Sequence, residues 1–259
     1  MATILFDRIV YGPVHSRRLG CSLGVNLSPT DGKRCTFDCV YCECGLNKDR
    51  IAHAPAPSVQ EVVSALEAKA KQMDAEGVKP DVITFSGNGE PTMHPHFAEI
   101  IKEVTAFRDR MYPSARVAAL SNSTMLHKEE VVRALLKVDD NLMKFDAASD
   151  ELISVIDRPV MKDFTAGRLI EQLCRFEGRL TIQTMFLKGE HEGLRIDNTD
   201  NESVTKWIEA LKLIRPKQVM IYTIDRETPV KTLQKVPKAD LEAIAVKVRN
   251  AGFAVTVSG

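Results

Sequence analysis

Short apolar runs alternate with longer amphipathic stretches along the whole chain of 259 residues, and this alternation limits the folds open to it. The apolar runs predict strands at residues 23–27, 82–85, 116–121, 142–146, 180–187 and 218–223, with a closing strand at 254–258. Helical spacing lies between them, after residue 58 and at about 95–110, 128–137, 167–176, 202–214 and 238–250. Strands that alternate with helices pair in parallel through right-handed crossovers. The chain therefore predicts an α/β fold, a partial (β/α)6 TIM-like barrel of parallel strands.

Two helix ends carry local signals of their own. Ser58 and Glu61 match a capping box before the helix that contains Val62 and Leu66. Gly252 stands in the helix-stop position before the closing strand. Residues 238–259 therefore predict a final helix and strand that close the barrel.

The composition favours an ordinary globular protein. A hydrophobic content of 44% in 259 residues can form a single large core, so one domain over residues 1–259 is expected. Thirty-five basic and 35 acidic residues give no net charge, and hence no overall electrostatic sign of nucleic-acid binding. The opening residues lack a secretion signal and no apolar run approaches the length of a membrane span, which predicts a cytoplasmic protein with no membrane partner.

Three cysteines, Cys35, Cys39 and Cys42, stand in the string CTFDCVYC with C-x3-C-x2-C spacing. They lie in a connection of about residues 28–57, far longer than an ordinary loop between a strand and a helix, and such loops are usually functional. Closed structural zinc sites normally use four side chains, whereas an iron–sulfur cubane held by three cysteines keeps one iron open. The spacing thus predicts a catalytic cluster with an open iron.

A structural zinc site is the alternative, because Cys44 follows Cys42 by two residues and Cys21 lies upstream. Zinc ribbons usually combine two well-separated cysteine pairs. Cys44 is also so near Cys42 in sequence that both are not expected to face one metal without strain. With Cys174, these extra cysteines are too scattered to predict a second cluster.

Polar residues after the second strand form the string SGNGEP at residues 86–91. Gly87 and Gly89 would allow the backbone to approach a ligand closely, and Glu90 would bring a carboxylate to the mouth of the barrel, where such folds carry their sites. A plain turn would account for the same residues.

CTFDCVYC followed by VITFSGNGEP resembles the radical S-adenosylmethionine (SAM) enzymes. The resemblance implies that Cys35, Cys39 and Cys42 hold a 4Fe-4S cluster whose open iron is chelated by the amino and carboxylate groups of SAM. It further implies reductive cleavage of SAM to a 5′-deoxyadenosyl radical, with an electron donor such as flavodoxin or ferredoxin.

The same resemblance implies a set of cofactor contacts. Glu90 would hold the SAM ammonium group, and the polar residues of later strand ends would contact the ribose and the carboxylate. Lys144 and Asp146 alternate on one strand, so inside the barrel they must be paired or ligand-bound. Gln183 could equally be a satisfied polar residue of its strand. The full set is Tyr41, Gly87, Asn88, Gly89, Glu90, Ser121, Asn122, Lys144, Asp146 and Gln183.

Two longer strings, YGPVHSRRLGCSLGVNLSP and FDAASDELISVIDRP, resemble the wybutosine-synthesis branch, which acts on a guanosine in tRNA. Basic residues before the first strand and after later strands could receive phosphate groups, although scattered solvated charge is the alternative. Residues 225–229 predict either a substrate contact or an ion-paired loop. The substrate is left open between a tRNA nucleoside and a small molecule. The basic residues are His15, Arg17, Arg18, Lys188, His191, Arg195 and Arg226.

Two other functions remain open from sequence. A glycyl-radical activating enzyme would share the cluster motif and the GEP segment, but would need a large protein partner. A zinc-binding scaffold without catalysis would use the cysteines alone.

Overall fold

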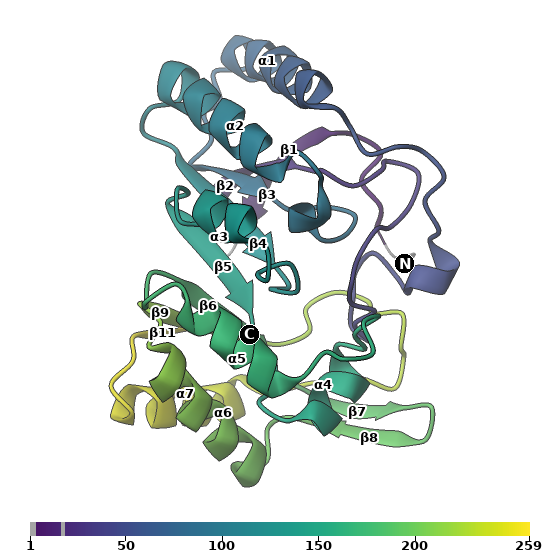
Figure 1. Ribbon diagram of the computed structural model, residues 1–259, viewed down its shortest axis with the longest axis vertical. Coiled ribbons are helices and arrows are strands. Elements are labelled where there is room, and N and C mark those ends of the chain that lie inside the picture. Colours follow the sequence, from purple (N-terminus) through teal and green to yellow (C-terminus); the bar gives the residue numbers. More distant parts are fainter. Residues whose placement is uncertain (1–3, 17–18) are drawn as a thin grey trace.

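The computed structural model describes residues 4–16 and 19–259, so Arg17 and Arg18 lie outside the described residues. Eight strands form one curled sheet in the order β1-β2-β3-β4-β5-β6-β9-β11 (Figure 1). Every neighbouring pair from β2 to β11 is parallel. The predicted partial TIM-like barrel is therefore confirmed. The strands are β1 (Val10–Ser16), β2 (Gly20–Val25), β3 (Val82–Phe85), β4 (Arg116–Ser121), β5 (Asp140–Lys144), β6 (Thr181–Met185), β9 (Gln218–Tyr222) and β11 (Val255–Ser258).

Six helices lie along one side of the curled sheet and bury their apolar faces against it (Figure 1). Leu66, Ile101 and Trp207 are almost fully buried in this shared core. The capping box is confirmed, since Ser58 accepts from the Glu61 N–H and the Glu61 carboxylate accepts from the Ser58 N–H at 2.7 Å. The helices are α1 (Val59–Ala75), α2 (Phe97–Met111), α3 (Glu129–Leu135), α5 (Ala166–Cys174), α6 (Asn201–Ile214) and α7 (Lys238–Asn250).

Several elements were not predicted. The sheet begins with β1, which pairs antiparallel to β2, and the seven-residue helix α4 (Asp150–Ile156) follows β5. A second sheet contains β7 (Leu187–His191), β8 (Leu194–Asp197) and β10 (Gln234–Lys235). Short 3-10 turns lie at η1 (Asn47–Asp49) and η2 (Pro91–Met93).

The single strand predicted at residues 180–187 is wrong, because β6 ends at Met185 and β7 starts at Leu187. The Asn198 side chain explains the break. Its amide donates to the Met185 carbonyl at 2.8 Å, and its oxygen accepts from the Leu187 N–H at 3.0 Å. A side chain thus takes two backbone partners that a continuous strand would need. Within the described part of the chain, no helix has the length and apolarity required to cross a membrane.

Candidate active site

The cysteine loop is fixed across the carboxyl ends of the strands from two sides. On the β3 side, Arg34 donates its N–H to the Asn88 carbonyl at 2.9 Å and accepts from the Glu90 N–H at 3.0 Å. On the α4 side, Val40 donates to the Ile156 carbonyl at 3.0 Å. The loop therefore sits where the fold places ligand sites.

The three predicted ligand thiols share one electrostatic environment. Burial raises the pKa of Cys35 to about 12 and also raises the pKa of Cys39. The pKa of Cys42 is lowered to about 6, chiefly by a hydrogen bond from the Cys44 thiol and also by Lys33. Burial lowers the pKa of Lys33, but the three thiols and Asp38 raise it, and the net shift is upward.

The donor chemistry of this loop fits a thiolate-held cluster. Three thiols from one loop interact with one another and with a buried cation, and cysteine thiolates are the ligands that iron–sulfur clusters use. As the described side chains stand, no three of His, Cys, Asp or Glu are close enough to hold a metal ion. Binding would require proton release, because the Cys35 and Cys39 thiols are protonated at neutral pH.

Cys44 is not placed as the sequence suggested. Its thiol donates to the Gly87 carbonyl at 3.4 Å and lies beside the Cys42 thiol, so the two neighbouring thiols come close together. Cys21 is the second residue of β2 and Cys174 ends α5, and neither is among the main influences on the pKa values of the loop thiols. Because the Cys44 thiol lies close to that of Cys42, the argument that the two cannot face one metal no longer counts against a zinc site. Metal analysis must therefore distinguish iron from zinc.

The glycine segment after β3 is packed against the cysteine loop. A Cβ on Gly89 would lie 1.8 Å from the Arg34 carbonyl oxygen, and a Cβ on Gly87 would lie 2.4 Å from the Asn26 side-chain oxygen. Asn88 uses its side-chain amide to donate to the Phe6 and Pro29 carbonyls, at 2.8 and 3.1 Å. The glycines are thus required by close backbone packing, and the Asn88 side chain holds the scaffold together.

Glu90 is buried, with 4% of its surface exposed, and its carboxylate faces the protein. It accepts from the Asn122 N–H at 2.6 Å, from the Ser121 hydroxyl at 2.9 Å, and from both the N–H and the hydroxyl of Thr92, at 3.0 and 2.5 Å. Burial raises its pKa although these donors oppose the shift. The Asn122 amide donates to the Thr36 hydroxyl at 2.9 Å and reaches the Cys35 sulfur at 3.5 Å. These residues form one network behind Cys35.

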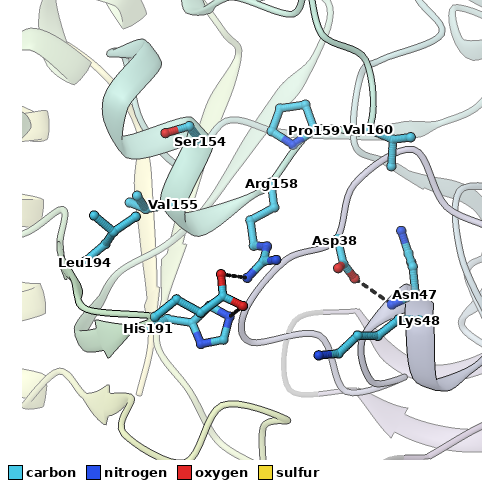
Figure 2. A pocket seen from close by; sticks show the side chains of 11 residues that line it. Asp38, Asn47, Lys48, Ser154, Val155, Arg158, Pro159, Val160, His191 and Leu194 are labelled. Atoms are coloured by element: carbon cyan, nitrogen blue, oxygen red, sulfur yellow. Dashed lines mark hydrogen bonds and ion pairs between the residues drawn. The ribbon is translucent and has the colours of Figure 1, made fainter.

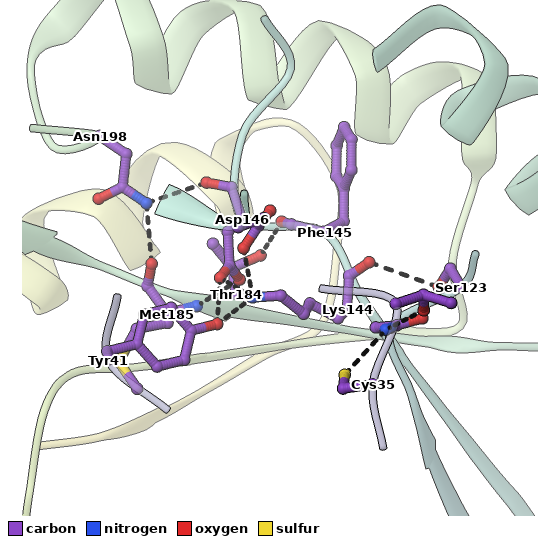
Figure 3. A network of polar contacts seen from close by, with 12 residues as sticks. Cys35, Tyr41, Ser123, Lys144, Phe145, Asp146, Thr184, Met185 and Asn198 are labelled. Atoms are coloured by element: carbon purple, nitrogen blue, oxygen red, sulfur yellow. Dashed lines mark hydrogen bonds and ion pairs between the residues drawn. The ribbon is translucent and has the colours of Figure 1, made fainter. Parts of the chain in front are cut away.

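A second network surrounds Lys144 and Asp146 (Figure 3), and Lys144 interacts electrostatically with Cys39. The Lys144 ammonium contacts the Tyr41 hydroxyl and the Asp146 carboxylate, lies over the Tyr41 ring at 4.5 Å, and is 2.7 Å from an Asp157 carboxylate oxygen. The other Asp146 oxygen accepts from the Met185 N–H at 2.9 Å. Lys144 and Asp146 are paired, but the prediction that both lie on one strand is wrong, because β5 ends at Lys144.

Gln183 lies in β6 and is buried, with 6% of its surface exposed. The structure therefore brings Tyr41, Lys144 and Asp146 together in one network and Glu90, Ser121 and Asn122 in another. The cysteine loop joins the two.

Two cavities adjoin the cysteine loop. A cavity of about 560 Å³ is lined by residues of β1 to β4, Tyr11 among them, together with Cys44, Gly87 and Arg226. A surface cleft of about 540 Å³ lies on another side, where Asp38 and Asn47 of the loop face His191 of β7 (Figure 2). The first cavity reaches Cys44 of the cysteine loop and Gly87 of the glycine segment.

Three of the predicted basic residues that the structure describes have acidic neighbours. Arg195 pairs with Asp197 at 2.9 Å, and Arg226 pairs with Glu43 at 2.6 Å. His191 lies 3.6 Å from the Glu192 carboxylate. Arg226 is ion-paired, which agrees with one of the two predictions for residues 225–229, and it also lines the inner cavity.

Three site residues were missed from sequence. Lys33 and Asp157 carry buried charge beside the thiols and Lys144, and Tyr11 donates to or accepts from the Ser86 hydroxyl at 2.7 Å in the inner cavity. Lys33 precedes the cysteine motif by two residues, and Asp157 lies in the string FDAASDELISVIDRP. Both residues therefore lie beside or within strings that predict function. Their burial could not be known without the fold.

The chain is similar in sequence to a known family and to individual known proteins. Residues 30–193 match the family described as the radical SAM superfamily. A UPF0026 protein of Helicobacter pylori is 32% identical over 228 residues, which are 86% of this chain and 68% of that protein.

Two solved structures share the fold. A radical SAM methyltransferase from Sphaerobacter thermophilus superposes with a TM-score of 0.68 at 16% identity, covering 92% of this chain and 65% of that one. A structure of TYW1 with a lysine-pyruvate adduct bound gives a TM-score of 0.65 at 16% identity, covering 88% and 73% of the two chains. Identities this low show similarity of fold alone.

Proposed function

We propose, since this chain belongs to the radical SAM superfamily, that it cleaves SAM reductively at a 4Fe-4S cluster held by Cys35, Cys39 and Cys42. The cluster and SAM together would supply a 5′-deoxyadenosyl radical that takes hydrogen from a substrate. The observation that carries the proposal is the placement of the cysteine loop, whose backbone is bridged to the glycine segment at Arg34 and Gly89. Flavodoxin or ferredoxin would provide the electron.

Two parts of the chain would hold SAM. Lys144 supplies a cation and Tyr41 an aromatic ring on one side of the thiols, where they suit a carboxylate and an adenine. Asp146 and Gln183 lie near them as candidate ribose contacts. On the other side, the missing side chains of Gly87 and Gly89 let this segment pack against Asn26 and Arg34 beside the cysteine loop, and its backbone would contact SAM.

Glu90 would act by positioning that backbone. Its carboxylate is committed to donors from Thr92, Ser121 and Asn122, which supports an indirect effect on the SAM ammonium group. We propose that Ser121 and Asn122 share this indirect role, with Asn122 also orienting Cys35.

Anaerobic reconstitution tests the central proposal. The protein should be brown, bind about four irons per chain, and form 5′-deoxyadenosine and methionine from SAM when reduced with dithionite. Cys39→Ala should lose iron and cleavage, whereas the matched control Cys174→Ala should keep both. Stoichiometric zinc without SAM cleavage would refute the proposal.

Replacement of Cys44 distinguishes a three-cysteine cluster from a four-cysteine zinc site, because its thiol lies beside that of Cys42. We expect Cys44→Ala to retain about four irons per chain, since a three-cysteine cluster does not need it. Loss of all metal from Cys44→Ala would instead favour a four-cysteine zinc site.

We propose the cavity of about 560 Å³ lined by residues of β1 to β4 as the substrate site. A tRNA nucleoside is the first candidate, supported by the resemblance of two strings to the wybutosine-synthesis branch and by the fold shared with TYW1. Deuterium transfer between a candidate substrate and 5′-deoxyadenosine tests it directly. No label exchange with any tRNA fraction would favour a small molecule.

A further inference from the structure

Lys33 is a buried cation for which neither the fold nor the proposed SAM contacts give a role. Its side chain is only 1% exposed. The ammonium donates to the Gly45 carbonyl at 2.8 Å, and the backbone is fixed by an N–H bond to the Arg50 carbonyl at 2.6 Å. Burial of an ammonium is costly unless negative charge or hydrogen bonds compensate it. The neighbours of Lys33 therefore explain why it is inside.

One carboxylate is not enough to explain this burial. Asp38 is the acid that forms an ion pair with Lys33 among the described residues, at 3.7 Å, and its nearer oxygen also accepts from the Asn47 N–H at 2.6 Å. Asp38 lines the surface cleft, as Figure 2 shows, and its side chain is 17% exposed. The pair is therefore long and shared with another donor.

The remaining neighbours of Lys33 are the loop thiols. The Lys33 ammonium donates to the Gly45 carbonyl at 2.8 Å, and the Gly45 N–H donates to the Cys42 carbonyl at 2.9 Å, so the cation lies against the turn that carries Cys42. There it interacts electrostatically with Cys42, Cys35 and Cys39. These are the three proposed cluster ligands, so the cation faces the negative charge that three thiolates and a cluster would bring. Reduction of the cluster would add a further negative charge at the same place.

We propose that Lys33 sets the reduction potential of the cluster by compensating its charge, with Asp38 opposing it. This inference rests on the proposed function. A fixed cation near a cluster stabilises the reduced form more than the oxidised form, because reduction increases the negative charge. Lys33 thereby favours transfer of an electron from the donor to the cluster, and Asp38 weakens that effect.

Redox titration of the reconstituted cluster, followed by electron paramagnetic resonance, tests the inference. Lys33→Met should lower the ratio of reduced to oxidised cluster at a fixed potential by about tenfold or more, equivalent to a midpoint about 59 mV more negative. Asp38→Asn keeps an acceptor for the Asn47 N–H and should shift the midpoint in the positive direction. Lys48→Met, on the exposed surface of the same loop, is the matched control and should leave the midpoint unchanged.

Opposite shifts in Lys33→Met and Asp38→Asn would support the inference, because a general disturbance of the loop would move both midpoints the same way. Equal midpoints in all variants, or shifts of the same sign, would overturn it. If Lys33→Met assembles no cluster, a positive shift in Asp38→Asn still supports the inference, and its absence overturns it. A wild-type protein that binds no iron would instead refute the proposed function, before any potential is measured.

Discussion

Replacement of Glu90 by glutamine tests whether this residue acts on the ligand or on the scaffold. The Glu90 carboxylate accepts from two backbone N–H groups, that of Asn122 at 2.6 Å and that of Thr92 at 3.0 Å, through different oxygens. Glutamine has one acceptor oxygen, and its NH2 group must face one of these N–H donors. Either orientation therefore leaves one buried backbone donor without a partner.

The expected cost follows from that count. An unsatisfied buried donor costs about 1–3 kcal/mol, so Glu90→Gln should lower the free energy of unfolding by about that amount. Because the carboxylate faces inward, SAM affinity should fall by less than about tenfold, a change of about 1.4 kcal/mol.

Urea denaturation and SAM binding should be measured on the same preparations of Glu90→Gln. Glu99→Gln is a matched control, since Glu99 is an exposed residue of α2, and it should change stability by less than about 0.5 kcal/mol. Unchanged stability in Glu90→Gln together with a large loss of SAM affinity would contradict the indirect role and favour direct contact with the ammonium group.

Three further perturbations follow from the packing. Gly89→Ala should abolish SAM binding and lower stability, because its Cβ would lie 1.8 Å from the Arg34 oxygen; SAM titration and urea denaturation check this. Lys144→Met should cost about 3–5 kcal/mol in urea, since it leaves two buried carboxylates unpaired, and adding Asp157→Asn should recover part of the loss. Because the pKa of Glu90 is raised in the native state, the folded protein keeps the Glu90 carboxyl protonated to higher pH than the unfolded chain does. The contribution of Glu90 to the free energy of unfolding therefore falls as the pH rises from 4.5 through the native-state pKa. Urea titrations across this range should show a weaker decline in Glu90→Gln, and identical pH profiles would contradict the shift.

Most of the regular elements could be predicted because their signals are local. The helix over residues 238–250 has the predicted bounds, since its apolar spacing and the following Gly252, at φ +94°, are written in neighbouring residues. The β6–β7 break could not be predicted. It depends on Asn198, which is 13 residues from Met185 in sequence and reaches it only in the folded chain.

The candidate site divides in the same way. The spacing of Cys35, Cys39 and Cys42 and the two glycines of the SGNGEP segment are properties of short strings, and they identified the site from sequence alone. The direction in which Glu90 points depends on partners from separate elements, and the burial of Lys33 depends on how its own long loop folds back, so neither was predictable. Asn122, for example, meets Glu90 across 32 residues.

The sequence by itself determined the order of strands and helices, the thiol ligands offered to a metal and the two segments that flank it, because periodicity and spacing are local. Tertiary structure decided which charges face those thiols. The Tyr41 hydroxyl and the Asp146 carboxylate are 105 residues apart in sequence, yet they meet at Lys144. Parallel strands carry their carboxyl ends to one edge, and only that convergence buries separate charges together, where a low dielectric makes each of them matter.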